Sequence, residues 1–399
     1  MISTSWWVIW KYWLSKKENG GFAVIMEHKN VWETYGKKQN KEVDTLAREY
    51  MDFLDNGKTE RECIDSIVNT IEAAGYRELE EIRKKGETLK KGDKVYSVWM
   101  NKSICFFQIG EKPLSEGMNI LGAHIDSPRL DVKQNPLYED GGFAYLDTHY
   151  YGGVKKYQWV TIPLALHGVV IKKDGTTVEV NIGEDEKDPV FFISDLLIHL
   201  SQEQLEKKAA KVIEGEALDL IVGNRPLVIK EKEDKEEEKS VAKDAVKAGV
   251  LDILKESYDM EEEDFLSAEL EIVPAGKARE AGFDRSMILA YGQDDRVCAF
   301  TSMKAMLELE QTERTACCIL VDKEEIGSVG ATGMQSKFFE NAVAEVMNLT
   351  GEYSELNVRR CLASSCMLSS DVSAGFDPSY ASAFEKKNAS FLGCGMVFN

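Results

Sequence analysis

The stretch VDKEEIGSVGATG, Val321 to Gly333, closes the apolar run Ala316–Val321, which contains neither Gly nor Pro. A run this short and evenly apolar is typical of a strand buried on both faces. Two adjacent carboxylates, Glu324 and Glu325, follow it. Because neighbouring side chains diverge in an extended chain, one Glu could hold a metal ion while the other acts on a water molecule. A lone Glu-Glu pair is more commonly an acidic loop end, so the choice between a loop end and a metal site depends on the rest of the chain.

Three further apolar runs end in a candidate metal ligand. They are Met118–Ala123 before His124, Met287–Ala290 before Asp294-Asp295, and Cys361–Leu368 before Asp371. In open α/β sheets, the loops at the carboxyl ends of parallel strands converge on one crevice. One His with several carboxylates suits a hydrolytic zinc, manganese or cobalt site better than a structural zinc, which normally uses cysteines. The repetition therefore favours a metal centre, and two acids among the ligands leave room for one that bridges two ions.

Each of these residues also has a purely structural explanation. His124 could be a core histidine, and Asp371 a turn residue. Asp294 and Asp295 could cap and begin the helix that follows them. Asp126, two residues after His124, could cap a turn, or it could orient the imidazole of a metal-binding histidine. The presence of four candidates at equivalent strand ends makes the metal centre the stronger hypothesis.

Composition narrows the class of protein. The chain has 399 residues, 43% of them hydrophobic, which is enough for two domains and a large core. Its net charge of −20 disfavours non-specific binding to nucleic acid or to an anionic membrane. The eight cysteines show no CxxC spacing, which is typical of free thiols in the cytosol. The glycines of Gly327–Gly333 lack the order of a phosphate loop, so nucleotide binding is disfavoured.

Periodicity predicts an α/β fold. The segment Glu42–Leu89 is mostly helical, Tyr96–Gly110 is strand-like, and helices alternate with strands again after residue 282. The middle of the chain is β-rich, with a hairpin over Gly168–Val180 that turns at Asp174-Gly175. We therefore expect a three-layer catalytic domain with a largely parallel central sheet, built from residues 26–132 and 283–399. Residues 133–282 would form a β-rich insertion into this domain.

Residues 1–25 do not match the rest of the chain. They hold four of its seven tryptophans, and their apolar part is too short to span a bilayer. We expect this segment to be a spurious or disordered extension, with Met26 as the start; an interfacial anchor is the alternative.

Five motifs together resemble the aspartyl aminopeptidase family of two-metal exopeptidases (metallopeptidase family eighteen), in its bacterial aminopeptidase 1 branch. They are GAHIDSPRLDVK, THYYGG, GQDDRVCAF, DKEEIGS and SSDVSAGFDPSY. The resemblance runs from about Met26 to the last residue. It implies a cytoplasmic metalloaminopeptidase that removes N-terminal residues from short peptides, with two divalent ions per subunit, zinc first and cobalt or manganese as alternatives. It also implies that the β-rich insertion, residues 133–282, is a dimerisation domain, and that the subunits assemble as a tetrahedral dodecamer whose active sites face an enclosed chamber.

The resemblance assigns metal ligands among the strand-end residues. His124 and Asp371 would hold one ion, and Glu325 would hold the second. Asp295 would bridge the two, with Asp294 as the less favoured choice.

The resemblance also assigns the remaining roles. Glu324 would be the general base, Asp126 would buttress His124, and His149 of THYYGG would lie near the substrate. The family has one more histidine ligand near its C-terminus, whereas the last histidine of this chain is His199. We therefore expect a fragment that lacks the terminal strand and helix of the catalytic domain. The second ion would then be under-ligated, and the chain as given could be inactive because this histidine ligand is absent.

Two other functions fit part of this pattern. A related two-metal deacylase or carboxypeptidase would have a similar site, although the set of motifs argues against it. A catalytically inactive assembly subunit would keep the shell without turnover. The preferred N-terminal residue, acidic or neutral, does not follow from the motifs.

Overall fold

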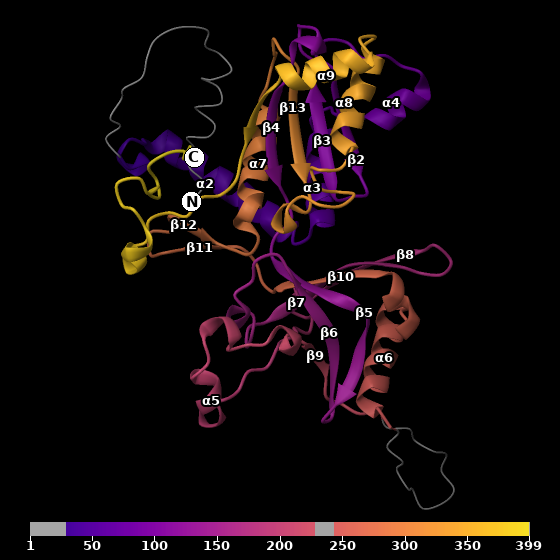
Figure 1. Cartoon of the computed structure of the whole chain (residues 1–399), viewed down its shortest axis with the longest axis vertical. Coiled ribbons are helices and arrows are strands. Elements are labelled where there is room, and N and C mark those ends of the chain that lie inside the picture. Colours follow the sequence, from indigo (N-terminus) through magenta and orange to yellow (C-terminus); the bar gives the residue numbers. More distant parts are fainter. Residues whose placement is uncertain (1–28, 228–242, 399) are drawn as a thin grey trace, which may run out of the picture. The chain divides into compact units, whose positions relative to one another are not determined.

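The computed structural model describes residues 29–227 and 243–398, and this part of the chain forms two compact units. One unit joins the residues up to Asp126 to those from Ala278 onward, and the other is Ser127–Lys277 (Figure 1). The insertion predicted at 133–282 overlaps the second unit, and its borders as a domain stay a prediction. The expected extension, 1–25, lies outside the described residues.

A six-stranded sheet forms the centre of the first unit. Its strand order is β1-β2-β3-β13-β4-β14. Three pairs of neighbouring strands are parallel: β1–β2, β13–β4 and β4–β14. Strand β3 is antiparallel to both of its neighbours, β2 and β13. The largely parallel sheet is thus confirmed, with β3 as its reversed strand. The strands are β1 (Arg77–Glu78), β2 (Lys94–Trp99), β3 (Ser103–Gln108), β4 (Asn119–His124), β13 (Ala316–Val321) and β14 (Cys366–Ser369).

The reversed strand follows from a tight turn. Met100 and Asn101 have left-handed φ angles of 53° and 52°, and the Lys102 N–H donates to the Trp99 carbonyl at 3.0 Å. Two successive left-handed residues make the turn that matches the twist of paired strands. The strand-like stretch expected over 96–110 is confirmed, and it is divided by this turn between the two strands of the β2–β3 hairpin.

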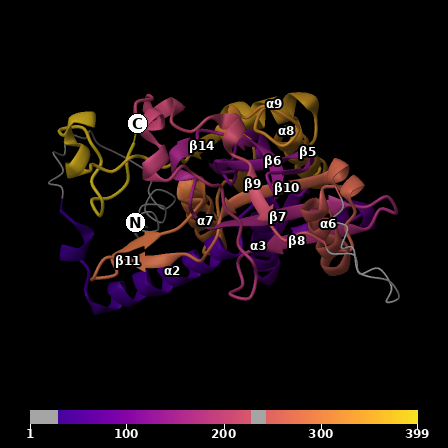
Figure 2. The ribbon, with the colours of Figure 1, turned by 90° about the horizontal axis from the view of Figure 1, so that it is seen from below.

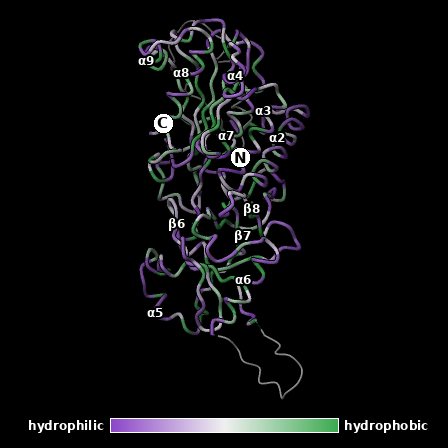
Figure 3. Tube along the Cα trace, turned by 90° about the vertical axis from the view of Figure 1, so that its right-hand side faces the viewer, coloured by the Kyte–Doolittle hydropathy of each residue, from purple (hydrophilic) through white to green (hydrophobic). Residues whose placement is uncertain are grey.

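Helices cover both faces of this sheet and complete the three layers. Alternate side chains of β13 separate the two cores: Cys318 and Leu320 pack with α2, α3 and α7, whereas Cys317 and Ile319 pack with α4, α8 and α9. Figure 3 shows hydrophobic stretches gathered inside this unit. The helices are α2 (Lys37–Asp55), α3 (Glu60–Ala73), α4 (Leu79–Lys85), α7 (Gln293–Leu307), α8 (Phe338–Leu349) and α9 (Glu355–Ser364).

Two of the predicted strand ends differ from the structure. Met287–Leu289 forms β12, which pairs with β11 (Arg279–Ala281) in a separate ribbon beside α2 (Figure 2). Cys361 lies in helix α9, and the strand before Asp371 begins only at Cys366. In both places a short apolar run did not reveal which element it belongs to.

The second unit is built on an antiparallel sheet of order β8-β7-β10-β5-β6-β9. The hairpin predicted over Gly168–Val180 is confirmed as β7–β8, but Gly175 closes a three-residue loop after Lys172 rather than a two-residue turn. Helix α6 packs on β5, β6 and β9. The elements are β5 (Arg129–Asp140), β6 (Phe143–Tyr151), β7 (Leu164–Ile171), β8 (Thr177–Ile182), α5 (Gln202–Leu205), β9 (Leu220–Gly223), α6 (Ala245–Tyr258) and β10 (Ala268–Pro274). Within the described parts of both units, no helix combines the length and the hydropathy that a membrane span requires.

Candidate metal centre

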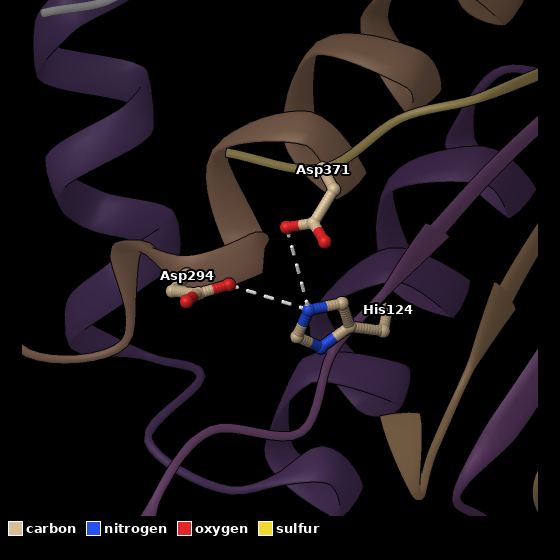
Figure 4. A group of neighbouring side chains, drawn as sticks. All are labelled: His124, Asp294 and Asp371. Carbon is tan, nitrogen blue, oxygen red and sulfur yellow. Dashed lines mark ion pairs between the residues drawn. The ribbon is translucent and has the colours of Figure 1, made fainter. Parts of the chain in front are cut away.

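His124 is the last residue of β4, which lies between its parallel neighbours β13 and β14, and its side chain is buried. Nδ1 of the ring lies 3.2 Å from Oδ1 of Asp126 and 2.9 Å from its carbonyl oxygen. On the opposite side, Nε2 lies 3.3 Å from Oδ1 of Asp294 and 4.0 Å from Oδ1 of Asp371. Figure 4 shows both carboxylates directed at this nitrogen.

The donor set fits a divalent ion such as zinc. One ligand atom each from His124, Asp294 and Asp371 lies within 4.8 Å of the others. Zinc–ligand bonds of about 2.0–2.2 Å place neighbouring atoms of a tetrahedral site roughly 3.4 Å apart. The distance of 3.3 Å from His124 to Asp294 matches this value, and that of 4.0 Å to Asp371 is somewhat longer. Both aspartates are more than half exposed, so they have room to close on an ion.

Asp126 connects two parts of the centre. Its buried carboxylate faces His124 through Oδ1 and accepts the backbone N–H groups of Glu324 at 3.2 Å and Glu325 at 3.1 Å. A carboxylate beside Nδ1 favours the tautomer in which Nε2 carries the free electron pair. The same side chain therefore orients the imidazole and fixes the start of the glutamate loop.

The adjacent residues Asp294 and Asp295 have different surroundings. Neither has helical dihedral angles, so the regular part of α7 begins after them, and the peptide bond between them is cis. Asp294 is the one that faces His124. Asp295 is fully buried, and among residues 29–227 and 243–398 its carboxylate has only the weak thiol donor of Cys298 beside it and no regular hydrogen bond.

Glu324 and Glu325 begin the short 3-10 turn Glu324–Ile326 that follows β13. Glu324 Oε2 lies 3.8 Å from His124 Nε2, and its side chain is about half exposed, at 48%. Glu325 is more enclosed: burial, and then the charge of Asp294, raise the pKa of its carboxyl to about 7. Asp294 is thus a neighbour of both His124 and Glu325.

The electrostatics of the cluster favour a bound cation. Burial alone would lower the pKa of His124, but its hydrogen bonds with Asp126 and Asp294 outweigh burial and raise the pKa to about 11. Burial raises the pKa of Asp295 to about 8. Carboxylates that raise one another's proton affinity in an enclosed place are typical of a site in which a metal ion replaces the proton.

His149 lies elsewhere in the chain. It is an exposed residue of β6 in the second unit, with Nδ1 3.5 Å from the Tyr150 carbonyl oxygen. Its expected place near the substrate stays a prediction.

Arg296 supports the centre and was missed in the sequence. Its side chain is buried, its Nε donates to the Ile125 carbonyl at 3.1 Å, and its Nη2 donates to the Lys58 carbonyl at 3.1 Å. It thereby ties the start of α7 to the residue between His124 and Asp126. A charged side chain directly before the apolar helix face Val297–Phe300 is the signal that could have identified it.

The chain is similar to known proteins in both sequence and fold. A family model described as aminopeptidase I zinc metalloprotease (M18) matches residues 53–399. A probable M18 family aminopeptidase 1 from Clostridium acetobutylicum is 59% identical over 376 residues, which are 94% of this chain and 79% of that relative. The crystal structure of an M18-family aminopeptidase from Thermotoga maritima matches with a TM-score of 0.84 at 42% identity, over 93% of this chain and 78% of that one. A structure of the S. cerevisiae mApe1 dodecamer, at 19% identity and a TM-score of 0.68 over 88% of this chain and 76% of that one, shares the fold.

Proposed function

Because the chain belongs to the family of aminopeptidase I zinc metalloproteases (M18), and is therefore a metal-dependent aminopeptidase, we propose that His124, Asp294 and Asp371 hold its zinc. The observation that carries this proposal is the convergence of one buried imidazole and two carboxylates from three separate segments within 4.8 Å. Asp295 is buried and its pKa is raised to about 8, so a nearby cation would favour loss of its proton and would balance the resulting charge.

A second ion would use Glu325, with Asp294 shared between the two. Asp294 lies 3.3 Å from His124, and its charge also acts on Glu325, which supports a shared role. The sequence favoured Asp295 for this bridging role. We assign it to Asp294 because that side chain faces the imidazole, whereas Asp295 lies buried beside it. Zinc is the first candidate for both ions, and cobalt and manganese are the alternatives.

Glu324 is the general base in this proposal. When bound, the metal supplies the Lewis acidity that stabilises the negative charge developing on the scissile carbonyl oxygen. Glu324 Oε2 lies 3.8 Å from Nε2 of His124, and its side chain is half exposed, so a water molecule can reach the carboxylate. Glu324 would take a proton from that water as the water oxygen attacks the scissile carbonyl carbon, and would pass the proton to the amine as the C–N bond breaks. Asp126 holds His124 and the Glu324 backbone in place while this happens.

The substrate would be the N-terminal residue of a short peptide, and amide substrates test this directly. The chain, loaded with zinc, should hydrolyse amino-acid amides, should lose this activity to a chelator, and should regain it when zinc is added back. N-acyl amino acids serve as the control substrate. Hydrolysis of the acyl amino acids instead of the amides would favour the related deacylase or carboxypeptidase. Zinc binding without hydrolysis of either substrate would favour an inactive assembly subunit.

A homo-oligomer is the second part of the proposal, with subunit contacts in the second unit. A run of large apolar side chains there is between 51% and 69% exposed, which is unusual for a free surface. A second copy of the chain is the simplest cover. The dodecameric assembly of the S. cerevisiae relative supports a larger shell, which the resemblance describes as tetrahedral. The apolar run consists of Leu196, Leu197, Ile198, Leu200 and Leu205.

Light scattering would test the assembly. The double variant Ile198→Asp/Leu200→Asp should dissociate to smaller species, while Leu356→Asp, at an apolar position of the first unit that is also more than half exposed, should not. A monomeric wild-type chain at micromolar concentration would contradict the proposal.

We also propose that the protein is cytoplasmic, since its eight cysteines form no disulfide in the described structure. Cell fractionation tests this proposal.

A further inference from the structure

Asp322 ends strand β13 as a fully buried carboxylate directly before the glutamate loop. Its Oδ2 accepts the hydroxyl of Thr332 at 2.6 Å, and its Oδ1 accepts the backbone N–H of Lys323 at 2.7 Å. Its own N–H donates to Ser103 Oγ at 3.2 Å. A buried carboxylate is costly unless such contacts compensate for the lost water. Besides the ammonium group of Lys323, which lies 3.4 Å from Oδ2, the side chain that compensates this carboxylate is that of Thr332, where the chain returns to it.

The loop Lys323–Ala331 is thus closed by one carboxylate, because Asp322 directly precedes the loop and binds Thr332, which directly follows it. Its return point is tied to the β2–β3 hairpin, because the Thr332 carbonyl accepts the Ser103 hydroxyl at 2.5 Å. The Ala331 carbonyl accepts the indole N–H of Trp99 at 3.0 Å. Thr332 itself is buried, whereas the Trp99 side chain is partly exposed on the outer side of the loop.

Two carboxylates, those of Asp322 and Asp126, fix the first three residues of the loop. Lys323 has a left-handed φ of 72°, a conformation that costs a non-glycine residue about 1–2 kcal/mol. The N–H of Lys323 is accepted by Asp322, and the next two N–H groups, of Glu324 and Glu325, are accepted by Asp126. These three consecutive contacts define the direction in which the two glutamate side chains leave the backbone.

Few apolar contacts hold the rest of the loop. Ile326 and Val329 are 46% and 56% exposed. A segment with exposed side chains and little apolar burial opens easily unless specific polar contacts restrain it. The hydrogen bonds at Asp322 and Thr332 are the buried restraints on its two ends.

We propose that Asp322 and Thr332 are positioning residues of the aminopeptidase reaction, a buried latch that closes the loop Lys323–Ala331 and keeps Glu324 and Glu325 directed at the centre around His124. The inference rests on the proposed roles of these glutamates. It adds that their placement depends on a contact outside the centre. Neither latch side chain touches the substrate or a metal ligand side chain in this arrangement, so the latch acts through the backbone of the loop.

A matched pair of substitutions tests the latch. Thr332→Val keeps the shape and removes the hydroxyl, whereas Thr332→Ser keeps the hydroxyl. In the zinc-loaded full chain, Thr332→Val should lower kcat by about 10–100-fold, as expected when a catalytic group shifts by about 1 Å, with KM nearly unchanged. Amide hydrogen exchange of residues 323–331 should accelerate, and zinc at the His124 site should be retained. Thr332→Ser should resemble the wild type in all four measurements.

A second variant keeps the test decisive if Thr332→Val folds poorly. Trp99→Phe removes the indole N–H that binds Ala331 at a partly exposed position, so it should loosen the same loop with a smaller effect on kcat. Unchanged kcat and unchanged exchange in both variants would overturn the latch. So would equal losses in Thr332→Val and Thr332→Ser with faster exchange throughout the chain. If the wild type itself shows no chelator-sensitive hydrolysis, the proposed function fails, and the exchange data alone decide whether the loop is latched.

Discussion

The buried carboxylate of Asp126 lies 3.2 Å from Nδ1 of His124, and the same carboxylate accepts the N–H groups that begin the glutamate loop. One side chain thus sets the orientation of the imidazole and the position of Glu324. This contact accounts for the spacing of two residues in the motif HID, because a carboxylate at that distance can turn back onto the ring.

Asp126→Asn should weaken zinc binding by about 10–100-fold, since loss of a carboxylate partner of a metal-binding histidine typically has this effect. The replacement amide can no longer accept both loop N–H groups while facing Nδ1, so kcat should fall as well. Competition titration with a zinc-sensitive chelating dye measures the affinity. Asp65→Asn, on the exposed face of α3, is the control and should leave the affinity unchanged. Wild-type affinity in Asp126→Asn would show that the contact has no role in metal binding.

The two adjacent glutamates should separate in their effects. Glu324→Gln should keep zinc bound and lower turnover by about 10²–10⁴-fold, the usual contribution of a general base. Glu325→Gln should reduce occupancy of the second ion. Elemental analysis beside steady-state kinetics on amino-acid amides distinguishes the two. If the variants exchanged these behaviours, the assignment of base and ligand would be reversed.

The adjacent aspartates provide a sharper comparison. Asp294→Asn should lower metal content because Asp294 faces His124 Nε2 and neighbours Glu325. Asp295→Asn should retain more metal than Asp294→Asn, since its buried side chain is not directed at that nitrogen. Metal content after dialysis against buffer without zinc measures the difference. The opposite order would restore the bridging role to Asp295, as the sequence suggested.

The sequence predicted the layers of the catalytic unit and most of the strand-end ligands because their signals are local. The evenly apolar run Ala316–Val321 can be buried only between two helical layers, and both cores of the sheet draw on it. Since β4, β13 and β14 are parallel neighbours, His124, the glutamates and Asp371 had to meet at one edge.

The choice between Asp294 and Asp295 could not be predicted in this way. Their preceding strand, β12, belongs to a separate ribbon, so the rule that joins strand ends does not apply to them. Their position depends instead on α7 packing against β4 and on Arg296 binding the Ile125 carbonyl. Contacts between residues so distant in sequence leave no local periodic pattern.

The packing around Arg296 predicts the effect of one glycine substitution. Gly292 has a φ of +77°, and a Cβ added there would lie 2.1 Å from Nη1 of Arg296. Gly292→Ala should therefore cost about 2–4 kcal/mol of unfolding free energy, from backbone strain and from displacement of a buried guanidinium. Gly75→Ala, with a φ of +89° and open space at its Cβ, is the matched control and should cost only about 1–2 kcal/mol. Urea denaturation measures both, and equal losses would show that Arg296 is free to move aside.

The most direct test of the metal centre is anomalous X-ray scattering at the zinc absorption edge, from crystals of the chain grown with zinc. We predict an anomalous peak enclosed by Nε2 of His124 and the carboxylates of Asp294 and Asp371, with a second, weaker peak between Asp294 and Glu325. A peak bounded by a different set of side chains, or no peak at His124 despite saturating zinc, would contradict the proposed centre.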